Sequence, residues 1–191
     1  EKVTSGMDAR LNQSGCCLIV LAEWKKKVYD FSKGIRAISS SIRRSIPAFL
    51  DSKIHHNNML SLVIAKIHAN IAGYDAAVML DDRGFVAELN DTNLFMVKEG
   101  VVYTPYANAC LPGITRQTFI NLLEENNINI LERDLSLVEF INADLVFATG
   151  TNGEITPVTE MDGREIKCDQ KYLEKLKDLF EAKLPSLCEP L

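Results

Sequence analysis

Long apolar runs are absent from the 191-residue sequence. None approaches about 18 residues, so no transmembrane helix and no membrane partner are expected. Positive charge is also scarce, with 21 basic against 26 acidic residues and a net charge of −5. Because no basic stripe is sustained, we expect no nucleic-acid partner.

Cysteine is limited to five residues, an odd number with no CxxC pair, so a disulfide framework is not expected. His55 and His56 are adjacent and have no Cys or carboxylate at ligand spacing, so no metal site is expected either. The thiol count fits a reducing compartment, and we expect an intracellular, by default cytoplasmic, protein. An organelle location stays open, because the opening residues lack an initiator Met and a targeting signature, and the chain reads as part of a longer protein.

The composition is that of an ordinary folded domain, with 47% hydrophobic and 25% charged residues. Apolar periodicity predicts helices over residues 58–72, 115–125 and 171–184, and a capping box at Ser136 predicts a short one. The 58–72 helix has one apolar face. Strands are predicted over residues 16–22, 35–42, 76–80, 85–89, 93–97, 101–104, 128–131 and 145–149, with a further hairpin at residues 162–163. This order is mixed α/β or α+β.

Two loops have the chemistry of an anion site. One lies at residues 111–116, where a Pro-Gly pair precedes a helix that begins at Thr115. The unpaired N–H groups of a helix start and its dipole attract anions, although Thr115 could simply cap its own helix. The other lies at residues 149–153, directly after a buried strand, although this segment could be an ordinary turn.

Two charged side chains are further candidates. Glu88 lies at the end of a predicted strand and is either an edge charge or a paired functional acid. Lys53 precedes the first long helix. A lysine that enters an apolar region becomes nucleophilic as its pKa falls, whereas the structural alternative is a surface lysine in a loop.

Taken together, these segments resemble the class IV, or fold type IV, pyridoxal-phosphate-dependent aminotransferases. This family includes branched-chain and D-amino-acid aminotransferases and aminodeoxychorismate lyases. The resemblance runs over residues 2–166 and rests on motifs that occur in order: KIHHNNML at 53–60, FVAE at 85–88 with TNLF at 92–95, LPGITR at 111–116, and TGTNGEITPV at 149–158.

The resemblance implies a role for each matched position. Lys53 would form the Schiff base with pyridoxal 5'-phosphate and carry the α-proton, with Lys66 as a second, more distant candidate. Glu88 would face the pyridine nitrogen of the cofactor. The cofactor phosphate would be bound by the following residues: Ile114, Thr115, Gly150, Thr151 and Asn152.

The sequence also departs from the family pattern. Met59 stands where better-known members have tyrosine, and the interval from Lys53 to Asn58 is one residue longer. Residues 1–34 resemble the end of the family's small N-terminal domain plus a linker, and residues 35–191 resemble its large cofactor-binding domain.

The resemblance implies transamination between an amino acid, branched-chain or related, and a 2-oxo acid, by a homodimer. Two alternatives stay open. One is a truncated, non-catalytic module that binds pyridoxal phosphate, because most of the small domain is not in this sequence. The other is a lyase of the aminodeoxychorismate type.

Overall fold

A computed structural model describes residues 8, 10, 18–24, 29, 33–151 and 154–187 of the chain. Asn152, one of the predicted phosphate residues, lies outside the described residues, as does most of the segment before residue 34. The predicted domain boundary at residue 34 therefore stays a prediction.

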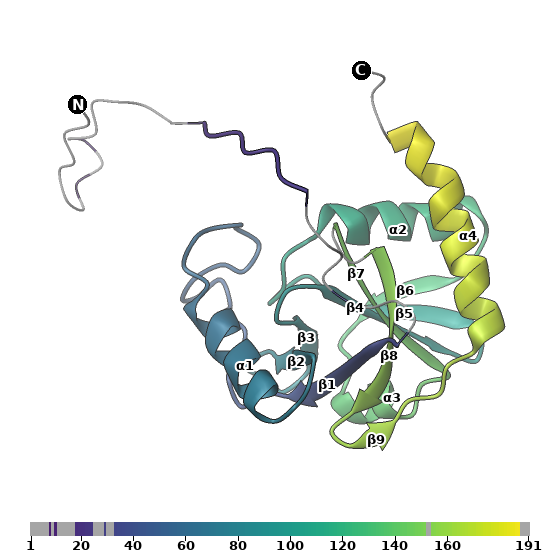
Figure 1. Cartoon of the computed structure of the whole chain (residues 1–191), viewed down its shortest axis with the longest axis horizontal. Helices are drawn as coiled ribbons and strands as arrows, with labels where there is room; N and C mark the ends of the chain where they lie inside the picture. Colours follow the sequence, from purple (N-terminus) through teal and green to yellow (C-terminus); the bar gives the residue numbers. More distant parts are fainter. Residues whose placement is uncertain are drawn as a thin grey trace.

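The described residues form one curled sheet, with the strand order β3-β2-β1-β8-β7-β4-β5-β6 and β9 paired to β8 (Figure 1). β1 is parallel to β2 and β8, β5 is parallel to β6, and the other pairs are antiparallel. The strands are β1 (Ile35–Ser39), β2 (Ala76–Leu80), β3 (Val86–Leu89), β4 (Asn93–Lys98), β5 (Val101–Pro105), β6 (Ile130–Arg133), β7 (Leu145–Gly150), β8 (Glu154–Met161) and β9 (Arg164–Glu165).

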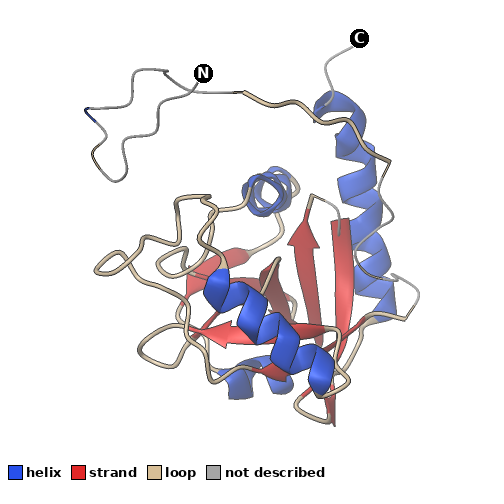
Figure 2. Cartoon of the chain, turned by 60° about the vertical axis from the view of Figure 1, so that its left-hand side comes forward, coloured by secondary structure: helices blue, strands red, loops and turns tan. Residues whose placement is uncertain are grey.

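Four helices surround this sheet within the described part of the chain: α1 (Leu60–Ile71), α2 (Ile114–Glu125), α3 (Leu137–Ile141) and α4 (Gln170–Leu187). α1 lies apart from α2 and α4 in both views (Figures 1 and 2). An aromatic core joins α2 and α4 to the sheet, where Phe95 and Phe147 stack at 5.2 Å between ring centroids and Phe119 of α2 meets both rings edge-on. None of these helices is long and apolar enough to cross a membrane.

The predicted order of elements from residue 35 onward is confirmed, because each helix and hairpin has a local signal. Gly73 ends α1 with a φ of +78°, a left-handed conformation that glycine adopts at little cost. The Ser136–Glu139 capping box is present in both directions at α3. The strand predicted over residues 128–131 instead spans Ile130–Arg133, where it pairs with β5.

The predicted strand over residues 16–22 is wrong where it can be seen. Residues 18–22 are not in a strand, and Leu18 is 87% exposed. An apolar run becomes a strand only when another strand pairs with it, and none of the pairings in the described sheet includes residues 18–22. Most of the predicted apolar face of α1 is exposed, including Leu60 and Ile71, whereas Ile64 is half-buried. Ala65 and Ala69 pack against the sheet instead, because α1 approaches it on its small residues.

Candidate active site

Glu88 occupies a buried position on β3, with only 6% of its surface exposed. Arg44, from the segment after β1, donates to its carboxylate with 2.7 Å between Nη2 and Oε1. Asn93, the first residue of β4, donates from Nδ2 to Oε2 at 3.1 Å. Of the two alternatives for this residue, the paired acid is therefore the one observed. Glu88 lies on the edge strand of the sheet, yet it is buried and ion-paired.

The electrostatic surroundings of Glu88 act in opposite directions. Burial raises the pKa of its carboxyl group to about 7, and the negative charge of Asp91 adds to this rise. Arg44, a hydrogen bond from the Leu111 backbone and the charge of Arg116 oppose the rise. A carboxyl group with a pKa near neutrality can exchange between its charged and neutral forms under physiological conditions, which is typical of functional acids.

Asn93 ties Glu88 to the loop before α2. Besides binding Glu88, its Nδ2 donates to the carbonyl oxygen of Leu111 at 2.9 Å. The backbone of Gly113 passes so close that a Cβ at this position would collide with Oδ1 of Asn93. The carboxylate and the start of α2 are therefore fixed relative to one another.

The first turn of α2 has the features of an anion site. Gly113 is the N-cap and provides no side-chain hydrogen bond to the helix. The N–H groups of the first turn have no partner within a helix, and the positive end of the helix dipole is at the same place. Ile114 is 85% exposed, so this turn is open to a ligand.

The end of β7 lies beside the same loop. Thr149 pairs with Asn93 in the sheet register, and it is only 1% exposed. Its hydroxyl group has no hydrogen-bond partner in the described part of the chain. Gly150 follows, and a Cβ there would approach Cγ2 of Thr92 to 2.9 Å. An unpaired buried hydroxyl is costly, so Thr149 is a donor that a ligand at this loop can satisfy.

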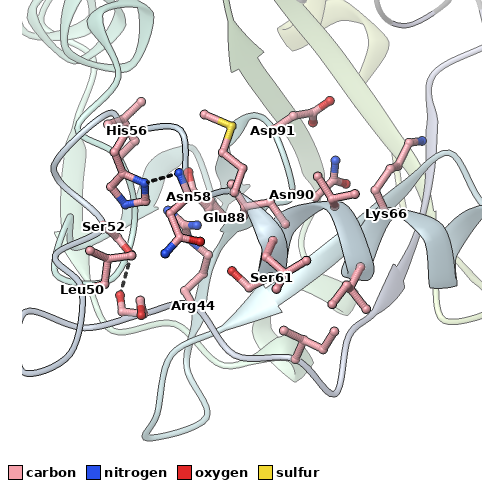
Figure 3. Close-up of a pocket in the computed structure, with 18 of the residues that line it drawn as sticks. Arg44, Leu50, Ser52, His56, Asn58, Ser61, Lys66, Glu88, Asn90 and Asp91 are labelled. Carbon is pink, nitrogen blue, oxygen red and sulfur yellow. Dashed lines mark hydrogen bonds and ion pairs between the residues drawn. The ribbon is translucent and has the colours of Figure 1, made fainter. Parts of the chain in front are cut away.

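A cavity of about 850 Å³ lies beside Glu88 (Figure 3). Its walls come from the segment after β1, from α1, from residues 88–91 and from Leu111. Arg44 and Glu88 lie close together in the cavity, while Lys66 lies at the other end of the view. The cavity lining combines apolar side chains with about as many polar or charged ones, so a ligand there meets both apolar surface and hydrogen-bonding groups.

Lys53, the lysine predicted to bind the cofactor, lies outside the cavity lining. The side chain of Lys53 is exposed and does not line the cavity, while its backbone N–H donates to Asp51 at 3.0 Å. His55 and His56 from the same loop do line it, and Nδ1 of His56 accepts a hydrogen bond from the Asn58 N–H at 3.1 Å (Figure 3). The structure thus does not place Lys53 next to Glu88.

Lys66, the second candidate, lines the cavity, but its amine donates to the backbone oxygen of Asp75. The predicted phosphate residues that the structure describes lie outside the cavity lining. Leu111 is part of the lining, whereas Ile114, Thr115, Gly150 and Thr151 are not. Asn93 and Leu111 connect Glu88 to the start of α2, which are the two parts of the predicted site.

Sequence reasoning missed Arg44 and gave no role to Asn93, although Asn93 stands inside one of the quoted motifs. Arg44 is 44 residues from Glu88, and no local pattern could pair them. No group of three or more potential metal ligands occurs in the part of the chain that the structure describes.

Comparisons with known proteins show what the chain is similar to. A family model for "Amino-transferase class IV" matches residues 3–161. Branched-chain-amino-acid aminotransferase-like protein 2 of Arabidopsis thaliana is 54% identical over 166 residues, which cover 87% of this chain and 30% of that relative. The branched-chain-amino-acid aminotransferase of Pseudomonas aeruginosa is 35% identical over 173 residues, covering 85% of this chain and 55% of the relative.

Solved structures agree with the sequence relatives. The branched-chain amino acid aminotransferase of Escherichia coli matches with a TM-score of 0.75 and 34% identity, over 78% of this chain and 52% of that one. The corresponding enzyme of Thermobaculum terrenum, in its PLP (holo) form, matches with a TM-score of 0.74 and 31% identity, over 79% and 50% of the two chains.

The chain thus spans 30% of the Arabidopsis relative and about half of these solved structures. The predicted fold, a mixed α/β domain of the fold type IV enzymes, is confirmed over about 80% of the chain. The match of the family model over most of the sequence, together with these relatives, shows that the chain belongs to the class IV aminotransferase family.

Proposed function

We propose that this chain supplies the cofactor-binding domain of a pyridoxal-phosphate-dependent aminotransferase. The complete protein would move an amino group between an amino acid, branched-chain or related, and a 2-oxo acid, and would act as a homodimer. The names of the relatives and solved structures above support this class of substrate. The observation that carries the proposal is the buried Glu88 carboxylate, held beside a cavity and tied through Asn93 to the start of α2.

The residues present fit the two ends of pyridoxal phosphate. The cofactor supplies an electron-withdrawing pyridine ring once its ring nitrogen is protonated. Glu88 is the acceptor suited to that nitrogen, because it is an acid in a buried site. The N–H groups of Ile114 and Thr115 and the unpaired hydroxyl of Thr149 are donors suited to the phosphate. Gly150, Thr151 and Asn152 remain proposed members of this phosphate site.

Lys53 remains the proposed residue for Schiff-base formation and proton transfer. Its amine is exposed, so the loop around it must turn the side chain inward to reach the cavity. A second candidate function follows from the same observation. If the lysine stays outside, the chain is a module that binds the cofactor reversibly and does not transaminate.

Reductive trapping separates these functions. The chain is incubated with an equal concentration of pyridoxal phosphate, reduced with borohydride, digested and mapped by mass spectrometry. We expect one labelled lysine, Lys53, and loss of the Schiff-base absorbance band in Lys53→Ala but not in the control Lys66→Ala.

An exposed lysine also reacts with pyridoxal phosphate when no binding site holds the cofactor. The extent of labelling of Lys53 must therefore decrease in Glu88→Gln if the cofactor is bound where we propose. Labelling at Lys66, or labelling that does not depend on Glu88, would refute the assignment of Lys53. Binding of the cofactor without any trapped lysine would support the non-catalytic module. Transamination of leucine, isoleucine and valine by the complete protein tests the activity itself.

A further inference from the structure

Arg44 is held in place more firmly than a surface arginine. It is 9% exposed, and three of its groups are bound at once. Its backbone N–H donates to Leu80 at 2.9 Å, its Nε donates to the carbonyl of Ala109 at 3.2 Å, and its Nη2 contacts Glu88 Oε1 at 2.7 Å. The guanidinium group therefore approaches Glu88 in a fixed orientation.

The two oxygens of Glu88 are approached from different directions. Oε1 faces Arg44 and Oε2 faces Asn93, and both Glu88 and Arg44 contribute to the cavity wall. A carboxylate has about four acceptor positions on its two oxygens, so these bonds leave room for a further donor from the cavity. The carboxylate is thus turned toward the cavity, but it is not saturated by the protein.

Among the groups around Glu88, Arg44 opposes protonation of the Glu88 carboxyl group most strongly. Burial favours the neutral acid, and Asp91, bound to the hydroxyl of Tyr29, also favours it. Arg116 also opposes protonation of Glu88, but more weakly than Arg44 does. Its guanidinium group is bound to Glu132 and to the carbonyl oxygen of Pro105. Cys110, a buried neighbour, is a thiol whose own pKa is raised by burial and by Glu88, so it adds no charge.

We propose that Arg44 is a positioning residue that turns the Glu88 carboxylate into the cavity and stabilises its charged form, so that Glu88 accepts a hydrogen bond from a protonated pyridine nitrogen. This inference rests on the proposed function, because it assumes a ligand of the pyridoxal phosphate class. In this role Arg44 acts on the ligand through Glu88.

The role follows from the sharing of one proton. When the ring nitrogen meets Glu88, one proton lies between them and resides on either the nitrogen or the carboxyl group. The positive charge of Arg44 stabilises the carboxylate and so places the proton on the ring. Without that charge, a buried carboxyl group takes the proton, and the ring loses its positive charge.

Nitrogen NMR of a bound ligand tests this directly. The ligand is pyridoxamine 5'-phosphate labelled with ¹⁵N in the ring, which has no aldehyde and needs no lysine. We expect the signal of a protonated ring nitrogen in the wild-type chain and in Arg44→Lys, which keeps the charge. In Arg44→Gln the signal should move to that of an unprotonated nitrogen. Arg43→Gln, the neighbouring residue outside the cavity lining, is the matched control and should behave like wild type.

A second measurement needs no ligand. The titration of Glu88, followed by its ¹³C carboxyl signal, should lie near pH 7 in wild type and clearly higher in Arg44→Gln, with Arg44→Lys close to wild type. An unchanged titration in a folded Arg44→Gln overturns the proposal, as does a ring nitrogen that stays protonated in that variant. If wild type binds no pyridoxamine phosphate but the titration shifts as expected, the proposed function fails while the effect of Arg44 on Glu88 stands.

Discussion

Single residues decide the chemistry of this site, and Glu88 is the clearest case. A carboxylate buried to this extent is costly unless it is paired, and Arg44 and Asn93 pair it. The cost is only partly offset, since the pKa of Glu88 stays raised to about 7. Glu88 therefore lowers the stability of the folded chain, and it places an ionisable group beside the cavity.

The raised pKa of Glu88 predicts a pH dependence of stability. Between pH 4.5, its ordinary value, and about pH 7, the folded chain keeps a proton on Glu88 that the unfolded chain has lost. The free energy of unfolding therefore falls as the pH rises through this window, by about 3 kcal/mol from this group. Urea unfolding of wild type and Glu88→Gln from pH 4 to 8 measures the effect.

The fall across this window should be smaller in Glu88→Gln, even though this variant is less stable overall because Arg44 loses its charged partner. Glu160→Gln is the control. Arg36 holds the pKa of Glu160 below its ordinary value, so removing Glu160 should leave the fall between pH 4.5 and 7 in place. Equal pH dependence in wild type and Glu88→Gln would show that Glu88 is not buried as described.

At the residue scale, the sequence could point to Glu88 but not to its partners. A short motif identified the acid, whereas its burial and its pairing with Arg44 depend on the parallel pairing of β1 with β2 and the antiparallel pairing of β2 with β3. For Lys53, the position in the sequence could be predicted but the location of the side chain could not. Its motif was recognisable, but the direction of its side chain depends on the path of an irregular loop, for which no periodic pattern exists.

At the scale of elements, the start of α2 and the strand β4 form one unit. Leu111 and Gly113 approach Asn93 closely, and this contact sets the distance between the carboxylate and the open first turn of the helix. Glycine is needed at residue 113 for lack of space and not for its backbone conformation, because its φ of −60° suits any residue.

Gly113→Ala should therefore displace the side chain of Asn93 and weaken its bond to Glu88. Overpacking of this kind costs about 1–3 kcal/mol of stability. The side-chain amide signal of Asn93 in NMR should shift. Gly84→Ala is the control, since nothing lies within 4 Å of a Cβ there and its cost comes only from a φ of +93°. A Gly113→Ala chain in which the Asn93 amide does not move would contradict the tight contact.

Periodic elements were predictable because their signals are local. The helices and hairpins after residue 35 follow from apolar spacing, a capping box and turn residues. Burial was less predictable. Residues 18–22 have the composition of a buried strand, but no strand of the described sheet pairs with them. Most of the larger apolar residues of α1 are exposed or line the cavity, because the helix packs against the sheet mainly through Ala65 and Ala69.

At the scale of the whole molecule, the curled sheet is what assembles the site. β3 and β4 are consecutive along the chain, and the antiparallel pairing of β4 with β7 places Thr149 beside Asn93. The order of elements could be predicted, but not this pairing of distant strands, because it depends on contacts far apart in the sequence. Family resemblance supplied the arrangement that local patterns could not.

The central claim is that Glu88 and the first turn of α2 bind the two ends of one ligand of the pyridoxal phosphate class. Calorimetric titration of the chain with pyridoxamine 5'-phosphate tests it most directly, because that ligand requires no lysine. We predict saturable binding by wild type, weakened about tenfold or more in Glu88→Gln, which corresponds to about 1.4 kcal/mol or more. Pyridoxamine, which lacks the phosphate, should also bind more weakly. Equal affinity in wild type and Glu88→Gln, or no binding by the wild-type chain, would contradict the claim.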